Sequence, residues 1–262
     1  MRITLFTTNK IRANYFINLL SNLTDELYVV QECDTIFPGY FSGKYPVSKK
    51  MSSYFKKVND AQEQLFGEQS AKISSNKINI LPILFGDLNK CSLHYLSDFL
   101  KSDVYIVFGS SYIKGDLVSF LIKNKAINIH MGISPFYRGT DCNFWALYDE
   151  NPHLVGATIH MLSKGLDSGN ILYHALSLIK SDPFEYTMST VKSAFHSIYD
   201  KLKNNSLLEM KSYNQNKDNE IRYSKKIDFD DKALDEYNKK LINLNSKNFD
   251  ESLLINPYFY KI

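Results

Sequence analysis

Cysteine is scarce in this chain of 262 residues, and its three cysteines, Cys33, Cys91 and Cys142, lie far apart. An odd number of widely spaced cysteines forms neither a disulfide framework nor the paired spacing of a zinc site, which is typical of proteins in the reducing cytoplasm. His-x-x-x-His and similar ligand spacings are missing as well. We therefore expect no metal site.

Long apolar runs and an excess of one charge are also missing. No stretch approaches the roughly 20 apolar residues of a membrane span. The apolar run within MRITLFTTNK is too short for a signal peptide. The formal net charge of +3 arises from interspersed basic and acidic residues and gives no reason to expect nucleic-acid binding. These absences predict a cytoplasmic protein that binds neither membranes nor nucleic acids.

Runs with strand composition alternate with helical patterns along the first 200 or so residues. Strand-like runs occupy 2–8, 26–33, 78–83, 103–109, 126–132, 155–162 and 170–179. Helical patterns occupy 9–23, 47–67, 91–100, 115–123, 142–150 and 183 to about 202, and we expect Gly67 to end the second of them. This alternation predicts an α/β fold with a mostly parallel sheet flanked by helices.

The composition of the sequence changes near residue 204. The remaining residues are polar and rich in Asn and Lys, with short hydrophobic patches such as SLLEM and ESLLINPYFY. We therefore divide the chain into a main domain, 1–204, and a small β-containing appendage, 205–262. The hydrophobic patches in an otherwise polar tail predict that the appendage forms the interface of a homodimer.

Two polar side chains stand at the end of a predicted strand in INIHMGISPFYRG. Asn128 and His130 are two residues apart, so they project from the same face, just before Gly132. Ligands bind at this edge of open parallel sheets. A pair of satisfied polar core residues is the alternative, and this evidence alone does not separate the two interpretations.

The segment GLDSG, 165–169, carries a third candidate, Asp167. Its two glycines permit a tight, left-handed backbone around the aspartate. As a simpler interpretation, the segment is a hairpin turn between the strands 155–162 and 170–179, where aspartate is common.

Taken together, these motifs resemble a known family. The runs N-I-H, S-P-F-Y-R-G, G-A-T-I-H and G-L-D-S-G-N-I-L resemble, in order and spacing, the 10-formyltetrahydrofolate-dependent formyltransferases. The resemblance is firm over about 104–175 and extends from residue 1 to about 200. The stretches RGTDCNFWALYDENPHLVGATIH and YFKKVNDAQEQLFG are most similar to the branch that formylates amino groups of nucleotide-linked sugars.

The resemblance implies a Rossmann-like catalytic domain and a catalytic trio of Asn128, His130 and Asp167. Formyl transfer to an amine passes through a tetrahedral oxyanion, to which an amide and an imidazole donate hydrogen bonds. His130 suits the proton transfers of the reaction, and Asp167 orients the imidazole or accepts the proton through water. The division of these roles stays open.

The same resemblance suggests binding residues elsewhere. Gly109 and Tyr112 match the segment that lines the folate pocket, although an ordinary strand-to-helix turn is the alternative. Asn9 and Arg12 open the first helix, whose N-terminal amides suit a phosphate. Arg12 is equally well explained as a surface residue.

Four further residues are weaker candidates for substrate binding. Ser134 and Arg138 follow His130 in sequence, and Arg138 is alternatively a brace for its loop. Tyr223 and Lys225 lie in IRYSKKIDF, where an aromatic and a cationic side chain suit a nucleotide. A solvated hairpin at a dimer interface explains that run slightly better.

The expected activity is transfer of a formyl group from 10-formyltetrahydrofolate to a nucleotide-linked amino sugar. The branch resemblance implies dTDP-4-amino-4,6-dideoxyglucose or a close relative, used for surface polysaccharide such as the O antigen of lipopolysaccharide. A methionyl-tRNA formyltransferase or another folate-dependent formyltransferase is the nearest alternative, but the short tail with balanced charge favours a small acceptor. A non-catalytic α/β binding protein would be expected to lack part of the trio.

Overall fold

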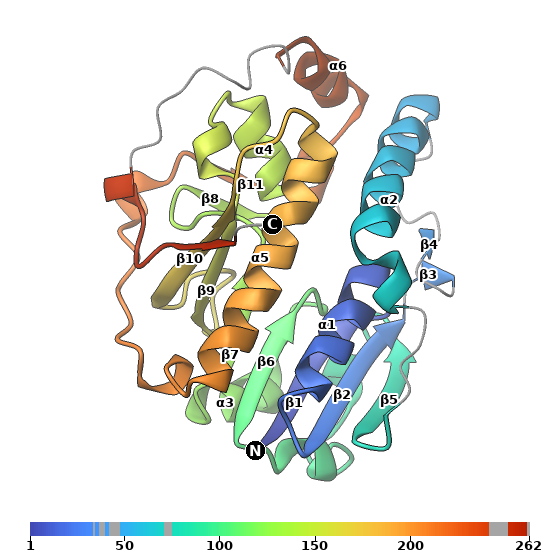
Figure 1. Cartoon of the computed structure of the whole chain (residues 1–262), viewed down its shortest axis with the longest axis vertical. Coiled ribbons are helices and arrows are strands. Elements are labelled where there is room, and N and C mark those ends of the chain that lie inside the picture. The colour runs from blue at the N-terminus through green and yellow to red at the C-terminus, as the bar shows by residue number, and fades with distance from the viewer. Residues whose placement is uncertain (34, 37–39, 42–47, 71–74, 241–250, 261–262) are drawn as a thin grey trace.

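The sheet at the centre of the protein has eight strands, in the order β12-β10-β9-β7-β6-β1-β2-β5 (Figure 1). The computed structural model describes residues 1–33, 35–36, 40–41, 48–70, 75–240 and 251–260. The sheet strands are β1 (Arg2–Thr8), β2 (Glu26–Cys33), β5 (Ile78–Leu84), β6 (Val104–Phe108), β7 (Ile127–His130), β9 (Ala157–Met161), β10 (Ile171–Ser177) and β12 (Tyr258–Tyr260). The first five in chain order run parallel, β9 is antiparallel to both its neighbours, and β12 is parallel to β10.

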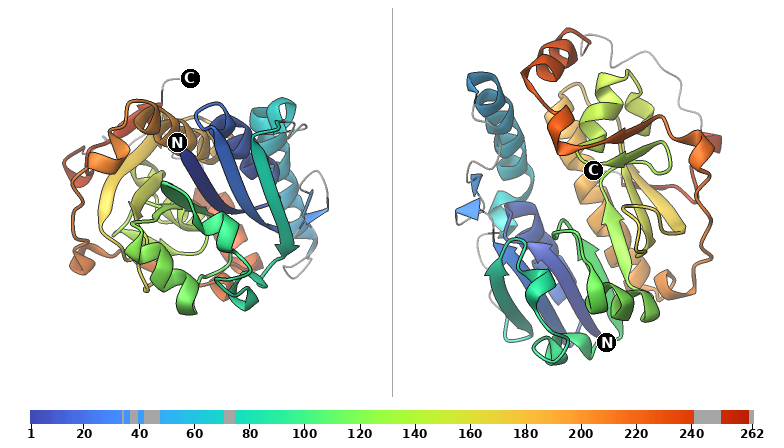
Figure 2. Two further views of the ribbon diagram at one scale, coloured as in Figure 1. Left: turned by 90° about the horizontal axis from the view of Figure 1, so that it is seen from below. Right: turned by 180° about the vertical axis from the view of Figure 1, so that it is seen from behind.

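Helices cover both faces of the sheet, as Figures 1 and 2 show. The helices are α1 (Ile11–Ser21), α2 (Lys49–Ser70), α3 (Gly115–Lys123), α4 (Cys142–Tyr148), α5 (Pro183–Lys203) and α6 (Asp231–Lys240). Apolar side chains of α1, α2 and α5 form the main core with one face of the sheet, whereas α3 packs on the opposite face. The predicted α/β fold with a mostly parallel sheet is therefore confirmed.

Two predictions about local structure were wrong. Helix α2 continues past Gly67 to Ser70, because a helical glycine costs only about 1 kcal/mol and the buried Phe66 anchors this end in the core. The segment 91–100 forms turns and a short 3₁₀ helix, Ser97–Leu100, in place of a longer helix. There the Ser92 hydroxyl accepts a hydrogen bond from the Tyr95 amide, which competes with helical pairing. Val47, the first residue of the predicted helix 47–67, lies outside the described residues.

A third apolar cluster joins α4, the first turn of α2 and α6. Trp145 lies in it and is buried, with the Arg222 guanidinium 4.6 Å from its ring centroid. Arg222 also donates to both carboxylate oxygens of Asp149, at 2.9 and 2.6 Å. This pair fixes the segment around Arg222 to the end of α4.

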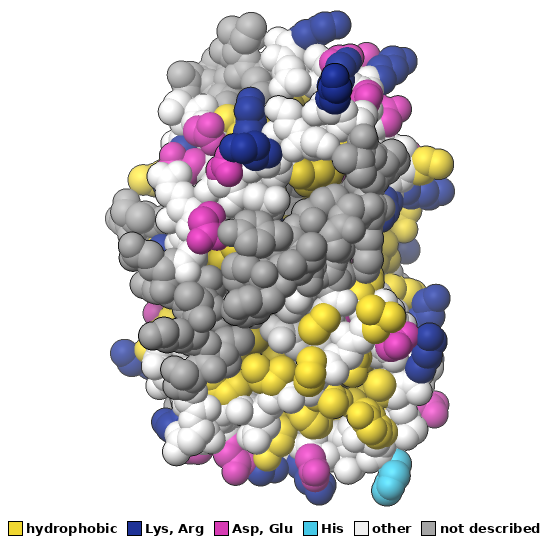
Figure 3. Space-filling view, turned by 90° about the vertical axis from the view of Figure 1, so that its right-hand side faces the viewer, with side chains coloured by type: hydrophobic (Ala, Val, Ile, Leu, Met, Phe, Trp, Pro, Cys, Tyr) yellow, Lys and Arg dark blue, Asp and Glu magenta, His cyan; other side chains and the backbone are white. Residues whose placement is uncertain are grey.

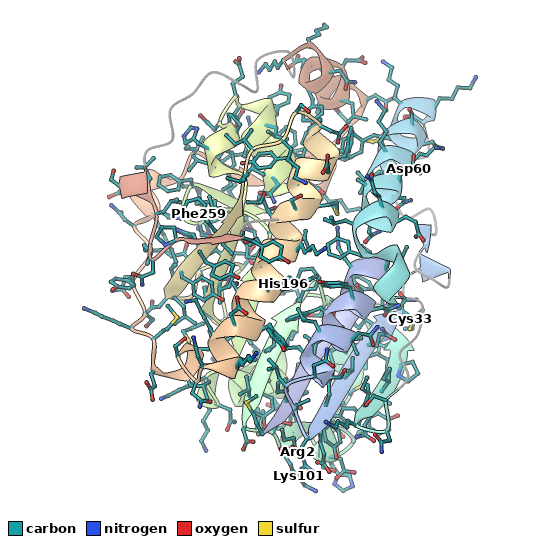
Figure 4. The ribbon with its side chains drawn as sticks, viewed as in Figure 1. Arg2, Cys33, Asp60, Lys101, His196 and Phe259 are labelled. Atoms are coloured by element: carbon teal, nitrogen blue, oxygen red, sulfur yellow. The ribbon has the colours of Figure 1, made fainter. Side chains whose placement is uncertain are left out.

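The residues after 204 pack on the first 204 through two short strands. Strand β11 (Arg222–Ser224) pairs in parallel with β8 (Tyr137–Gly139), so the run 221–229 is no hairpin, and Lys226–Asp228 is a 3₁₀ turn. At the sheet edge, β12 lies beside α5, where Figure 4 labels Phe259 and His196. The Tyr260 ring stacks on His196 with centroids 4.4 Å apart. The division at residue 204 stays a prediction.

Strand β5 is the opposite edge of the sheet. Figure 3 views this side of the molecule and shows hydrophobic side chains gathered on its lower half. Leu84, at the end of β5, is 67% exposed, and Pro82 lies within the strand. Proline has no N–H to offer a further strand and is tolerated at sheet edges. Two-residue strands β3 (Thr35–Ile36) and β4 (Tyr40–Phe41) form a separate pair. Within the described residues, no helix is long and apolar enough to cross a membrane.

Candidate active site

Strands β7 and β9 place four polar side chains on one face of the sheet. Their register pairs Asn128 with His160 and His130 with Thr158. Directly paired residues of neighbouring strands project to the same side. Ala157 and Ile159, which alternate with Thr158 and His160, lie in the main core on the opposite face. The strand alternation thus brings an amide and two imidazoles together where β7 ends.

The turn between β9 and β10 brings Asp167 to the same place. Its Oδ2 lies 3.3 Å from Nδ1 of His130, and the two side chains are 9% and 7% exposed. Oδ1 lies 4.0 Å from Nε2 of His160. Residues that the sequence separates by almost 40 positions therefore form one cluster with Asn128.

The backbone of this turn is left-handed at Asp167, with φ of 47°, in agreement with the left-handed backbone expected around the aspartate. Neither flanking glycine has a positive φ. Gly169 is needed for another reason, because a Cβ there would lie 1.7 Å from the carbonyl oxygen of Met161. Gln215, from the tail, donates from Nε2 to the carbonyl oxygens of Asp167 and Gly169, each at 2.8 Å. This side chain holds the turn from outside.

The imidazole of His130 is enclosed by hydrogen-bond acceptors. Nε2 lies 3.1 Å from the carbonyl oxygen of Tyr137, and Nδ1 faces the carboxylate of Asp167. A carbonyl and a carboxylate both accept hydrogen bonds, so a doubly protonated ring satisfies both contacts. Both ring nitrogens of His130 therefore face hydrogen-bond acceptors.

His160 has one hydrogen-bond acceptor and one hydrogen-bond donor as its partners. Its Nδ1 lies 2.9 Å from the carbonyl oxygen of Met161, which requires a proton on Nδ1, and its Nε2 then accepts from the amide Nδ2 of Asn128 at 2.9 Å. Burial lowers the pKa of His160 to about 4, although the charge of Asp167 opposes this shift. The neutral His160 thereby orients the Asn128 amide, which keeps a second N–H for a ligand.

A cavity of about 920 Å³ opens over this cluster. Seven of the residues singled out from the sequence line it, namely Arg12, Gly109, Tyr112, Asn128, His130, Asp167 and Tyr223. Apolar side chains such as Val107, Ile113 and Leu162 line it, and so do the cationic residues Lys10 and Arg12. One cavity thus joins the cluster to both apolar and cationic lining residues.

Four other candidates do not line the cavity. Asn9 precedes the lining residue Lys10. Ser134 is fully buried, with its amide donating to Oγ1 of Thr158 and its carbonyl accepting from His174. Arg138 donates to the Glu220 carboxylate and to the carbonyl of Leu166, which is the bracing role given as its alternative. Lys225 opens the 3₁₀ turn, where its amide donates to Asp228.

Two charged residues of the site were missed at the sequence level. Lys10 stands beside the candidates Asn9 and Arg12, and that neighbourhood was the available signal. Asp141 lines the cavity in the left-handed conformation, with φ of 55°. Burial raises the pKa of its carboxyl, and the positive charges of Lys10, Arg12 and Lys226 oppose that shift. These three cations therefore lie close to one carboxyl group at the cavity wall.

Glu32 was also missed, and it supports the Gly109 side of the cavity. Its carboxylate accepts from the amide of Ser111 at 2.5 Å and from the Ser111 hydroxyl and the amide of Gly86 at 2.8 Å. The end of β2 thus anchors the loops that follow β5 and β6. Among the described residues, no group of three or more His, Cys, Asp or Glu side chains is arranged to hold a metal ion.

Comparison with known proteins shows which family this geometry resembles. Residues 93–204, which include the whole cluster, match the Formyl transferase family model. This part of the chain is therefore similar to the formyl transferase family. The match confirms the resemblance seen in the sequence and the expectation of a formyl-transferring enzyme.

Solved structures support the fold of this domain and its tail. A sugar N-formyltransferase from a Shewanella species superposes with a TM-score of 0.54 at 14% identity, covering 100% of this chain and 93% of that one. A 4-N formyltransferase from Francisella tularensis gives 0.50 at 17%, covering 99% and 98%. An N-formyltransferase from Helicobacter canadensis, solved with folinic acid and dTDP-3-aminofucose, gives 0.50 at 12%, covering 92% and 80%. At these identities the likeness concerns the fold.

Proposed function

We propose that the protein transfers a formyl group from 10-formyltetrahydrofolate to the amino group of a nucleotide-linked amino sugar. The observation that supports it best is the cluster of Asn128, His130 and Asp167 on the wall of a cavity of about 920 Å³, within the part of the chain that is similar to the formyl transferase family. The cavity is within the size range of small-molecule sites and has few convergent polar groups, as such sites do.

In the proposed reaction, the acceptor amine attacks the formyl carbon, the C=O bond becomes a C–O⁻ bond, and the C–N bond to the folate then breaks. The second N–H of Asn128 donates to the oxyanion, with the imidazole of His130 nearby. Each such donor typically contributes about 3–4 kcal/mol to the transition state. His160 acts on Asn128 and has no contact with the formyl group in this scheme.

The amine loses a proton and the folate nitrogen gains one. Asp167 is the carboxylate next to His130, so a proton released by the amine passes to Asp167 through water or directly. His130 holds protons against two acceptors and supplies one to the leaving nitrogen. Charge within the pair is conserved, because one group accepts a proton while the other donates one.

The apolar and the cationic residues that line the cavity suggest how the substrates are placed. We assign the folate to the wall with Gly109 and Tyr112, where apolar side chains and loop backbone suit a flat pterin. We assign the acceptor to the wall with Lys10 and Arg12, whose charges suit a diphosphate. Asn9 joins them as a backbone contributor at the start of α1, and Ser134, Arg138 and Lys225 have no direct contact in this assignment.

The acceptor we propose is dTDP-4-amino-4,6-dideoxyglucose or a close relative, for surface polysaccharide such as O antigen. The fold neighbours include a 4-N formyltransferase and an enzyme solved with a dTDP-linked amino sugar, which supports this class of acceptor. Methionyl-tRNA is the competing acceptor, but the balanced charge of residues 205–262 favours a small acceptor. The cytoplasmic location expected from the sequence stays a prediction.

We also keep the proposal of a homodimer formed through residues 205–262. The hydrophobic patches of the tail were the reason for this proposal, and part of them is buried within the same chain. Leu207 lies in the main core, and Tyr258 packs against that core. Leu208 and Leu253 of the same patches remain exposed. A particle mass equal to one chain at micromolar concentration contradicts this proposal.

The decisive experiment is incubation of the protein with 10-formyltetrahydrofolate and a panel of dTDP- and UDP-linked amino sugars. We expect mass spectrometry to detect a formylated sugar nucleotide and absorbance to show release of tetrahydrofolate. The parallel reaction contains methionyl-tRNA in place of the sugar nucleotides. Formylation of the tRNA alone, or of no acceptor at all, contradicts the proposed function.

A further inference from the structure

Tyr223 projects from the tail into the wall of the cavity. Strand β11 pairs with β8 in a register that sets Tyr223 opposite Arg138, eight residues after His130 in sequence. The ring is 44% exposed and lines the cavity. Its hydroxyl makes no hydrogen bond within the described residues. Hydrogen bonding within the chain does not account for its position.

Arg138 contacts the ring of Tyr223 and supports it. The guanidinium carbon of Arg138 lies 5.7 Å from the ring centroid, within the range of a cation–π contact. Arg138 is itself fixed by the Glu220 carboxylate at 2.9 Å and by the carbonyl of Leu166 at 2.8 Å, and its side chain is 12% exposed. Leu166 adjoins Asp167, so the ring is coupled to the catalytic turn. A preorganised aromatic surface binds a flat ligand without the cost of ordering it.

We propose that Tyr223 is the stacking surface for the nucleobase of the acceptor, with Arg138 as its support. This inference rests on the proposed function and adds a subsite to it. Lys10 and Arg12, which line the same cavity, supply the positive charge for the diphosphate between the base and the amino sugar. Stacking tolerates any base, because every base has a π face, so this subsite accepts thymidine and uridine diphosphates alike.

A second tyrosine in the cavity provides a matched comparison. Tyr112 lies on the Gly109 side and is 46% exposed, close to the value for Tyr223. Its hydroxyl donates to the carbonyl of Lys164, and the Lys114 ammonium lies 5.5 Å from its ring centroid. Substitutions of the two tyrosines therefore remove the same side chain from two different elements that line one cavity.

Calorimetry with dTDP, UDP and tetrahydrofolate, each alone, tests the proposal without any turnover. We expect Tyr223→Ala to weaken dTDP and UDP by the same factor, about 10- to 100-fold. Tetrahydrofolate affinity should stay within about 2-fold. Tyr223→Phe and Tyr223→Trp should retain nucleotide affinity, since both keep an aromatic face. For Tyr112→Ala we expect the reverse, a loss of tetrahydrofolate affinity with nucleotide affinity kept.

Three results overturn the inference. Unchanged dTDP affinity in Tyr223→Ala means that no base stacks there. Loss of tetrahydrofolate affinity instead means that the ring serves the folate. A change of particle mass, with nucleotide affinity kept, makes Tyr223 an interface residue. Thermal unfolding of each variant checks that β11 remains in place. These measurements need no acceptor amine. The stacking role of Tyr223 can therefore be contradicted while formyl transfer is observed, and nucleotide stacking can be observed while formyl transfer is not.

Discussion

Asn128 and His160 form a hydrogen bond across β7 and β9, with the amide Nδ2 and the imidazole Nε2 2.9 Å apart. The other ring nitrogen of His160 is held by the carbonyl of Met161. The tautomer of a buried, neutral histidine thereby decides which end of the Asn128 amide faces it. An amide reversed by rotation would present its oxygen to the oxyanion and repel it.

The first prediction concerns the donor itself. Asn128→Ala should lower kcat about 10²- to 10³-fold, because it removes one hydrogen bond to the oxyanion. His130→Asn should have an effect at least as large, since the ring also takes part in proton transfer. Steady-state kinetics with a saturating donor measures both. His94→Asn, at an exposed histidine, serves as the control and should match wild type. Near wild-type turnover of Asn128→Ala would show that the site is misassigned.

A double-mutant cycle tests the role given to His160. His160→Ala should lower kcat because Asn128 loses its orientation, but the double variant Asn128→Ala, His160→Ala should be no slower than Asn128→Ala alone. Groups that act as one unit are not additive. If the two losses in kcat multiply, His160 acts independently of Asn128.

Gln215 gives a third prediction, about the support of Asp167. Gln215→Ala removes two hydrogen bonds to the 167–169 turn, each of about 1 kcal/mol. We expect kcat to fall about 10-fold while the KM for the donor changes little. The control is Gln64→Ala, at an exposed position of α2. Equal kcat values for the two variants contradict this role.

The buried histidines predict a dependence of stability on pH. Burial lowers the pKa of His174 to about 4, as it does for His160, from the ordinary value of 6.5. The unfolded chain thus binds protons that the folded chain excludes, so stability is full above about pH 6.5 and is lost as the pH falls toward 4. At pH 5 each of these histidines lowers the free energy of unfolding by about 2 kcal/mol relative to its value above pH 6.5.

Denaturant unfolding at pH 7 and pH 5 measures this effect. Between the two pH values, His174→Gln should lose about 2 kcal/mol less unfolding free energy than wild type, whatever its stability at pH 7. Comparing the two proteins cancels the carboxylates, which titrate in both. The same loss in both proteins would mean that His174 does not exclude protons in the folded state.

Gly169 supplies a prediction about packing at the catalytic turn. Gly169→Ala places a Cβ 1.7 Å from the Met161 carbonyl oxygen, so the turn must move. We expect a loss of about 3 kcal/mol in the free energy of unfolding. Gly86→Ala is the comparison, because its φ of 95° is unfavourable for alanine but nothing lies within 4 Å of the new Cβ. Its cost should stay near 1–2 kcal/mol. An equal cost at the two sites contradicts the steric explanation.

Periodicity predicted most of the elements, because apolar spacing directly reflects which face of an element is buried. It failed where core packing or a local hydrogen bond outweighed the pattern of apolar residues. Gly67 reads as a helix end, yet Phe66 on the same turn is anchored in the core and the helix continues. Residues 91–100 read as a helix, yet Ser92 and its neighbours form turns beneath the sheet.

The residues of the candidate site were also only partly predicted from the sequence. Asn128 and His130 were found together because two residues of one strand share a face by local geometry. Asp141 and Lys10 were missed because neither has a motif of its own, and they meet only through the fold. Ser134 looked suitable by sequence proximity and Lys225 as a cation close to an aromatic residue, but neither lines the cavity.

The sequence by itself determined the strand that carries Asn128 and His130, the turn that carries Asp167, and the family to which these motifs point. Those features depend on neighbouring residues, so spacing along the chain is enough to specify them. Only the tertiary structure decided that His160 orients Asn128, that Gln215 holds the catalytic turn, and that Tyr223 from the tail reaches the cavity. Each of these contacts joins residues brought together by strand pairing and core packing, which no local pattern encodes.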